Sequence, residues 1–330
     1  MRIEEIIKTL PLSKGEYPEG GREYVVKWGN IKERNMLNSQ YIKYKLASGG
    51  MNLLALLPFG ALWVISDCLY VLLRHVVGYR KKVVRTNLRN SFPEKSVAEL
   101  REIERKFYHY LCDYLVSEVK MSRLSPQEIV NRMSYDNLEV FTERTGQGRG
   151  IALLIPHYGH YEWLVNLKLF VPQAYQILHI YKPLHNPYID GMLQRVRSQY
   201  GGVNVAKHAT VRTVVKMHKE GTHFGVGFIT DQSPNKTEAK YWTTFLHQDT
   251  VFMDGAEKLA KMVDMSVLYA DIHYLRRGYC QVHFDVITDS PKDTADGEIT
   301  EAFARCLEQT IRRDPPYWFW SHKRWKIKRQ

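Results

Sequence analysis

The segment His157–Glu162, with the sequence H-Y-G-H-Y-E, combines the residue types of a general base and a carboxylate partner. His157 directly follows the apolar run GIALLIP, and Gly159 permits a sharp bend before Glu162. If His157 lies in a turn and Glu162 in the first turn of a helix, the two side chains can meet, although a spacing of five would separate them on one regular helix. Glu162 would then hold one imidazole nitrogen and leave the other free as a general base.

Two other interpretations of this segment are a metal site and a histidine that only hydrogen-bonds the backbone. His157, His160 and Glu162 offer zinc ligands, but the H-E-x-x-H order is absent and no other cluster supplies a fourth ligand. The four cysteines are far apart and form no C-x-x-C pair, which favours a reducing compartment over a disulfide framework. We therefore expect no metal.

The elements that position these residues alternate in type after residue 150. Short apolar runs typical of buried strands occur at 150–157, 174–183, 223–234, 265–274 and 280–287. Helical stretches occur at 162–170, 187–200, 211–220, 255–263 and 300–312. This alternation predicts an α/β fold, with a mostly parallel or mixed central sheet flanked by helices.

Catalytic groups in such sheets collect at the carboxyl ends of strands. Asp231 and Gln232 end the run 223–234, where a polar pair could hold an acceptor hydroxyl; the alternative is a turn, since Ser-Pro follows.

Farther toward the N-terminus, Ser96 is a good N-cap for an amphipathic helix of about twenty residues, for which packing is a sufficient explanation.

The composition is that of an ordinary globular protein, with 44% apolar and 25% charged residues in a chain of 330. It excludes a disordered tail protein and a collagen-like fibre. The net charge of +12 favours acidic partners, and 11 of these charges lie in residues 74–93 and in the last ten residues. No basic helix with interleaved aromatic residues and no recognised motif supports nucleic-acid binding, and the two stretches flank an apolar segment and the chain end, so we expect no nucleic-acid partner.

The first basic stretch follows the most apolar segment, Met51–Leu73, which has the 20-odd residues needed to cross a bilayer as a helix. An apolar run with a basic flank is typical of a membrane anchor whose flank is cytoplasmic. Pro58 and Asp67 favour either a buried core helix or a helix lying in the membrane interface. We expect this segment to be a helical membrane anchor, and the sequence does not decide whether it crosses the bilayer.

Beyond the anchor, a set of ordered motifs resembles a known family. They are the basic stretch 76–96 with R-x-N-L-x-x-S-F-P, the pair His157 and Glu162, Tyr181-Lys182-Pro183 with Asn186-Pro187, Asp231-Gln232-Ser233-Pro234, and PPYWFWSHKRWK at 315–326. From about Tyr41 to Lys326 the chain resembles the late acyltransferases of lipid A biosynthesis, within the His-x4-Asp/Glu glycerolipid acyltransferases. It differs in having Lys182 where arginine is usual and Tyr161 where tryptophan is common.

The resemblance implies a fatty acyl transfer from an acyl carrier protein thioester to a hydroxyl of a lipid A precursor, at the cytoplasmic face of the inner membrane. His157 and Glu162 would be the catalytic dyad, with no cofactor because the thioester is a co-substrate. The remaining candidate site residues fall into two groups. The candidate substrate-binding residues are Lys182, Asp231 and Gln232, from the matched motifs, and Arg195, from its place on the helix after Asn186-Pro187. The chemistry of acyl transfer needs oxyanion donors, for which the candidates are backbone N–H groups near Gly159, or Lys182.

The implied partners are acyl carrier protein, anionic membrane lipids and the lipid A precursor. Two alternatives remain: the same chemistry on another acceptor, such as a lysophospholipid or an amino-acid lipid, and an inactive membrane-surface scaffold. The expected organisation is an extension of unknown role at 1–46 with a short helix at 3–10, an anchor and basic flank at 47–92, and an acyltransferase domain at 93–330, whose α/β body begins at about 150.

Overall fold

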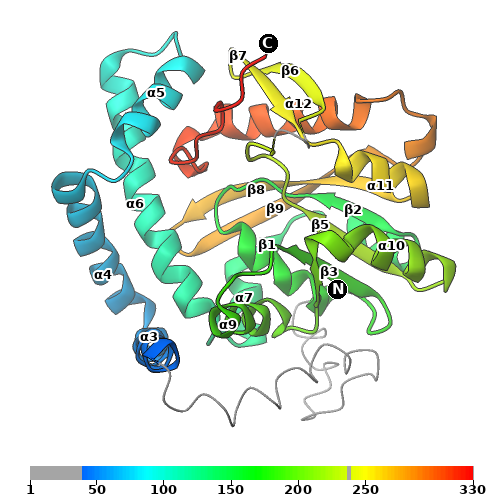
Figure 1. The fold of residues 1–330 in the computed structure, drawn as a ribbon, viewed down its shortest axis with the longest axis horizontal. Helices are drawn as coiled ribbons and strands as arrows, with labels where there is room; N and C mark the ends of the chain where they lie inside the picture. Colours follow the sequence, from blue (N-terminus) through cyan, green and yellow to red (C-terminus); the bar gives the residue numbers. More distant parts are fainter. Residues whose placement is uncertain (1–38, 236–238, 330) are drawn as a thin grey trace.

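A computed structural model describes residues 39–235 and 239–329. The helix expected at 3–10 and most of the extension 1–46 therefore lie outside the described residues. The described chain forms a central sheet with helices on its sides and a column of N-terminal helices against one flank (Figure 1).

The central sheet has seven strands in the order β1-β9-β8-β2-β5-β3-β4. Their bounds are β1 Met133–Tyr135, β2 Ile151–Leu154, β3 Gln176–Tyr181, β4 Val203–Ala206, β5 Phe224–Phe228, β8 Ser266–Arg276 and β9 Tyr279–Thr288. All neighbours pair in parallel except β8 and β9, which form an antiparallel hairpin. The expected α/β fold with a mostly parallel, mixed sheet is confirmed.

Strand β2 lies at the centre of this sheet, because β5 and β8 pair with it on its two sides. All four of its residues are buried, as its continuous apolar sequence predicts. The sheet begins in sequence with β1 at Met133, before residue 150, from which the alternating pattern was expected.

The helices surround the sheet and supply most of the remaining core. Their bounds are α3 Ser39–Leu56, α4 Phe59–Val71, α5 Lys81–Ser91, α6 Val97–Met121, α7 Pro126–Arg132, α8 Leu138–Gly146, α9 Pro187–Ser198, α10 Thr210–Lys219, α11 Gly255–Val263 and α12 Glu298–Arg313. A π-helical turn, η3 Leu72–Val77, continues α4, and short 3-10 segments are η4 Tyr161–Phe170, η5 Lys207–Ala209, η7 Pro291–Asp293 and η8 Pro315–Tyr317.

Helix α6 is the long connection between the N-terminal helices and the sheet. Ser96 caps its first turn and exchanges hydrogen bonds with Glu99, which confirms the helix start expected at Ser96. Helices α3, α4 and α5 pack along α6 (Figure 1).

The apolar segment Met51–Leu73 is not one continuous helix. Pro58 separates α3 from α4, because proline cannot donate the hydrogen bond of an interior helical residue. Among the described residues, one helix, Phe59–Val77, is long and apolar enough to cross a membrane, and 11% of its most apolar window is buried.

A two-stranded hairpin, β6 Tyr241–Phe245 and β7 Gln248–Phe252, lies outside the main sheet beside α12. Its turn residues Leu246 and His247 have φ angles of 48° and 61°, a conformation usually taken by glycine or asparagine. The sequence gives no such turn signal, which is why this hairpin was not expected.

Candidate active site

His157 lies just beyond the carboxyl end of β2, where the sequence pattern placed it. The adjacent strand β5 ends three residues before Asp231, so the parallel pairing of β2 and β5 brings the two residues to the same edge of the sheet. Nδ1 of His157 is hydrogen-bonded to Oδ1 of Asp231. The backbone N–H of His157 also donates to Oδ2 of Asp231, at 3.0 Å.

Asp231 is fully buried, and a third donor holds its carboxylate. Nε1 of Trp318 donates to Oδ2 of Asp231 at 2.8 Å. Burial alone would raise the pKa of Asp231, but the charge of His157 and the hydrogen bonds from His157 and Trp318 outweigh burial and lower it. The ionised carboxylate therefore fixes the imidazole by Nδ1, and Nε2 is the nitrogen left to act on a substrate.

Glu162 does not occupy the position that we expected beside the imidazole. Its carboxylate pairs with the guanidinium of Arg197 on α9, with N···O distances of 2.8 and 3.1 Å. The chain turns at Gly159, whose φ is 54°, and the ring of Tyr161 then packs against His157 with centroids 4.8 Å apart. The expected contact between Glu162 and His157 is therefore absent. Instead, Asp231 pairs with His157, and Glu162 pairs with Arg197.

The pair of Glu162 and Arg197 lies in a polar group that extends to α6. Burial alone would lower the pKa of Arg197, but the adjacent charge of Glu162 raises it. Burial of Glu118, with the like charge of Glu162 added to it, raises the pKa of Glu118 well above its usual range. Arg197 donates its hydrogen bonds to Glu162, and Oε1 of Glu118 has no hydrogen-bond partner among the described residues, so the raised pKa favours the neutral, protonated form of Glu118.

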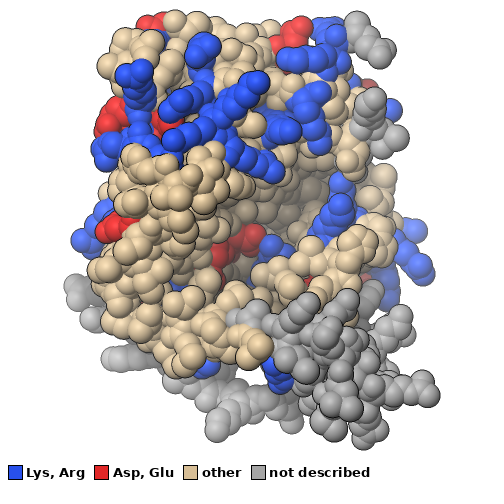
Figure 2. All heavy atoms as spheres, turned by 60° about the vertical axis from the view of Figure 1, so that its left-hand side comes forward, with Lys and Arg blue, Asp and Glu red and all other residues tan. Residues whose placement is uncertain are grey.

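An apolar cavity opens beside this pair. Glu162, Arg197 and Tyr161 line one part of it, and side chains of β2, η4, β3 and β5 line the rest. Gly225 and Gly227 lie at alternate positions of β5 and also border the cavity, so the absence of side chains there leaves it room. The cavity therefore has a charged end next to the site and an apolar interior. Figure 2 shows a hollow in this face of the molecule, with acidic and basic side chains in its wall.

The C-terminal segment 314–326 crosses the site and closes it. The N–H of Gly159 donates to the carbonyl of Tyr317 at 3.0 Å, and Trp318 reaches Asp231. The ring of Phe319 lies 6.0 Å from that of His157. Because its N–H is already engaged, Gly159 does not fit the expected role of an oxyanion donor.

Asn87 of α5 also holds the C-terminal segment 314–326 in place, through hydrogen bonds to its backbone. Its Nδ2 donates to the carbonyls of Trp320 and His322, at 2.8 and 2.9 Å, and Arg80 donates to the carbonyl of Ser321 at 2.9 Å. The R-x-N-L motif and the C-terminal motif, more than 200 residues apart, are thus parts of one structure. The sequence showed both motifs but gave no sign that they touch.

The remaining predicted site residues lie at the surface or near it. Lys182, after β3, and Arg195, on α9, are exposed, and Gln232 is half-buried beside Asp231. Arg195 and Arg197 are two positions apart on α9, so they point to different sides of the helix, and it is Arg197 that meets Glu162.

His160 is a structural residue. It is fully buried, stacks on Trp163 with centroids 4.4 Å apart, and burial lowers its pKa to about 3. Within residues 39–235 and 239–329, no group of three histidine, cysteine or carboxylate side chains is placed to hold a metal ion.

An α/β sheet with a histidine fixed by a buried carboxylate at a central strand end, beside an apolar cavity, is the arrangement expected of an enzyme that uses the histidine as a general base. The description "Bacterial lipid A biosynthesis acyltransferase" belongs to the family whose profile matches residues 30–327. The chain belongs to this family, and it is an acyltransferase of lipid A biosynthesis.

Individual proteins similar to this chain carry names that agree with the family, although their sequence identity to it is low. The chain is 20% identical over 228 residues to the lipid A biosynthesis acyltransferase of Haemophilus influenzae, covering 68% of this chain and 70% of the relative. It is 23% identical over 137 residues to lipid A biosynthesis acyltransferase 2 of Shigella flexneri, covering 41% of this chain and 42% of that one. It is also 23% identical over 137 residues to the lipid A biosynthesis myristoyltransferase of Escherichia coli K12, covering 41% of each.

Proposed function

We propose that this acyltransferase moves a fatty acyl chain from an acyl carrier protein thioester to a hydroxyl of a lipid A precursor, with His157 as the general base. The observation that carries the proposal is the imidazole held at a central strand end by the buried, ionised Asp231. This arrangement fixes the ring and stabilises the imidazolium that forms during the reaction.

In the proposed reaction, His157 transfers the proton of the acceptor hydroxyl to the leaving thiol. Nε2 of His157 takes the proton of the acceptor hydroxyl as its oxygen attacks the thioester carbonyl, and the new C–O bond forms. The tetrahedral intermediate then collapses, the C–S bond breaks, and the imidazolium returns the proton to the leaving sulfur. No covalent acyl-enzyme is required. Lys182 stays our candidate donor to the developing oxyanion.

In this scheme Glu162 acts with Arg197. Both line the charged end of the apolar cavity, where Arg197 could meet a polar group of a bound substrate. Glu162 is then a binding and positioning residue that holds Arg197 toward substrate, while Asp231 is the carboxylate that supports His157. Gln232 and Arg195 remain candidates for contacts with the acceptor.

The basic surface supports the proposed donor and location. Exposed side chains of Arg80, Lys82, Arg85 and Arg89 follow the apolar helix in sequence. Such a surface attracts both an acidic carrier protein and anionic lipids. Together with the exposed apolar helix, it supports membrane association at the cytoplasmic face of the inner membrane.

The test is acyl transfer by the purified, detergent-solubilised chain. Acyl carrier protein and coenzyme A thioesters of the same acyl chain are offered with a lipid A precursor or with a lysophospholipid, and products are identified by mass spectrometry. We expect an added acyl chain on the lipid A precursor, faster with the carrier protein. Product only on the lysophospholipid would contradict the acceptor, equal rates with both thioesters would contradict the donor, and no product on either would favour an inactive scaffold.

A further inference from the structure

The apolar helix Phe59–Val77 is tied to the body at its middle by charged side chains. Arg277, in the β8–β9 turn, pairs with Asp67 of α4 at 2.8 Å and with Asp113 of α6 at 2.6 Å. Ser66 donates to the same Asp113, at 2.5 Å, and the guanidinium lies over the ring of Trp63 at 5.0 Å. These contacts explain Asp67, the carboxylate that was out of place in an apolar segment.

The chain before the helix is held against the same body. Tyr44 of α3 stacks on Tyr188 of α9, with ring centroids 5.0 Å apart. Nζ of Lys120, on α6, donates to the carbonyls of Ala55 and Leu57 at the end of α3, both at 2.9 Å. The residues that lead into the apolar helix therefore lie on the α/β body.

The chain after the helix returns to that body as well. Arg80 and Asn87 bind the C-terminal segment that closes the active site, and Arg85 pairs with Glu104 of α6 at 2.8 Å. Since both ends and the middle of the helix contact one folded unit, the helix cannot cross a bilayer without drawing part of that unit into the hydrocarbon. Burying the charges of Arg277, Asp67 and Asp113 there would be costly.

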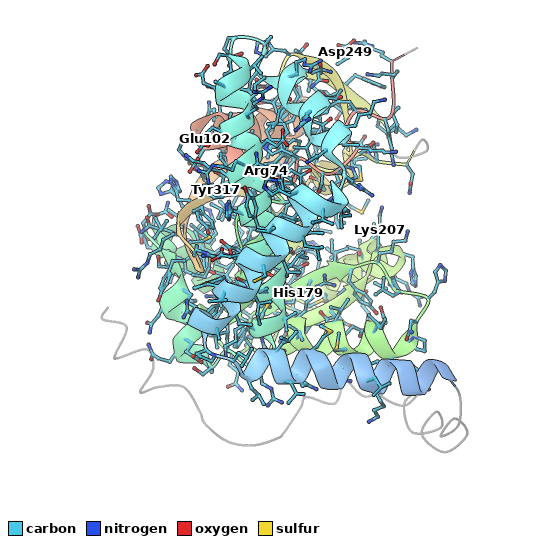
Figure 3. The ribbon with its side chains drawn as sticks, turned by 90° about the vertical axis from the view of Figure 1, so that its left-hand side faces the viewer. Arg74, Glu102, His179, Lys207, Asp249 and Tyr317 are labelled. Atoms are coloured by element: carbon cyan, nitrogen blue, oxygen red, sulfur yellow. The ribbon has the colours of Figure 1, made fainter. Side chains whose placement is uncertain are left out.

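The outward side of these N-terminal helices is apolar. Its exposed large apolar side chains are Leu46, Leu53, Leu54, Leu56, Val64, Val71, Leu72, Val76 and Val77. Figure 3 views this side, with α4 and η3 running across the body, α3 along its lower edge, and Arg74 of η3 beside the upper part of this helix. In Figure 2 a broad surface almost free of charge lies below a band of Lys and Arg, and the hollow opens beside it.

We propose that the chain is a monotopic membrane protein, in which α3, α4 and η3 lie in one leaflet and do not span the bilayer. This inference rests on the membrane association in the proposed function. The apolar side chains enter the acyl region, and the basic band beside them meets anionic headgroups, which are complementary in charge. The hollow next to this surface then opens at the level of the leaflet, where a lipid acceptor can enter sideways.

Topology can be tested with single cysteines on either side of the helix, in a full-length chain whose native cysteines are replaced. Lys45→Cys and Lys82→Cys introduce the thiol at exposed polar positions before and after Phe59–Val77. A membrane-impermeant maleimide is applied to sealed membrane vesicles of right-side-out and of inside-out orientation. Detergent-solubilised protein is the control in which both positions must react.

We expect both cysteines to react in inside-out vesicles and neither to react in right-side-out vesicles. Reaction of the two cysteines from opposite sides would overturn the monotopic arrangement and establish a span. Recovery of the chain in the soluble fraction would instead contradict the membrane association of the proposed function. The two failures are thus distinguishable.

Discussion

At the scale of single residues, the site depends on which carboxylate supports His157. The local sequence placed His157 at a strand end correctly, and it offered Glu162 as the partner because that residue is near in sequence. The actual partner, Asp231, comes from the next strand in space, 74 residues later. Local spacing cannot reveal such a pair. The signal that could have found it was Asp231 at the end of a second predicted strand, since parallel strands end at the same edge.

Asp231→Asn tests this pairing. The amide is neutral and can donate to Nδ1, which leaves the proton on Nε2 and removes the base, so we expect kcat/KM to fall by roughly 10²–10⁴-fold. Glu162→Gln should also lower the rate, but it should leave the pH at which the rate begins to fall unchanged, because Glu162 does not touch the imidazole. Exposed Asp249→Asn is the control. An altered pH profile in Glu162→Gln with a normal one in Asp231→Asn would reverse the assignment.

His322 predicts a pH dependence of stability. The N–H of Ser233 donates to its Nε2 at 3.1 Å, and burial lowers the pKa of His322 from 6.5 to about 4. Between these values the unfolded chain binds a proton that the folded chain does not, so stability falls as the pH falls through this window.

In wild type, His322 makes the free energy of unfolding rise with pH between 4 and 6.5, with a slope of up to about 1.4 kcal/mol per pH unit. His322→Gln removes this titrating group, so its slope should be smaller by about that amount. Chemical denaturation at several pH values measures this slope, with His208→Gln, at an exposed position, as the control. Identical slopes in wild type and His322→Gln would show that His322 does not lose its proton on folding.

At the scale of elements, the long apolar runs and periodic helices were predictable, and β2, β3, β5, β8 and β9 follow them. The misses have physical causes. Strand β4 is a four-residue edge strand, and the β6–β7 turn places Leu246 and His247 in conformations that their residue types do not announce. The contact between α5 and the C-terminal segment was also hidden, because it joins motifs at opposite ends of the chain.

Asn87→Ala tests whether this contact supports the site. Losing Nδ2 leaves the carbonyls of Trp320 and His322 without their buried donor, which should lower stability by about 1–3 kcal/mol. Turnover should fall as well, because the same segment carries Trp318 to Asp231. Thermal unfolding and acyl transfer measure the two effects.

Asn90→Ala, three residues later on the same helix, is the matched control, since its hydrogen bond to Gln248 is exposed. Equal effects of the two substitutions would mean that the C-terminal segment is held without Asn87.

At the scale of the whole molecule, the sequence showed an apolar segment with a basic flank but left its arrangement open. Composition measures length and apolarity, which a spanning helix and an interfacial helix share. In the structure, the apolar helix begins after Pro58, and the ion pair of Asp67 with Arg277 attaches it to the α/β body. The ion pair joins residues 210 positions apart, and no local pattern contains such a contact.

If the exposed apolar face of α4 and η3 enters the membrane, as we propose, substitutions of valines on this face should weaken membrane binding more than substitution of an exposed valine elsewhere. A double variant, Val71→Asp with Val76→Asp, places two carboxylates on the exposed apolar face and should reduce binding to vesicles containing phosphatidylglycerol several-fold. Val211→Asp, at a valine of similar exposure on α10, should bind as wild type does. Vesicle flotation measures the bound fraction. Equal losses in both proteins would contradict a specific membrane face.

The central claim is that His157 is the base of an acyl transfer to a lipid A precursor. The most direct test compares wild type with His157→Ala in acyl transfer from acyl carrier protein thioester, after circular dichroism has shown that both are folded. The predicted result is an acylated product whose rate of formation falls by at least 10²-fold in the variant. Product formed at the wild-type rate by folded His157→Ala would contradict the account.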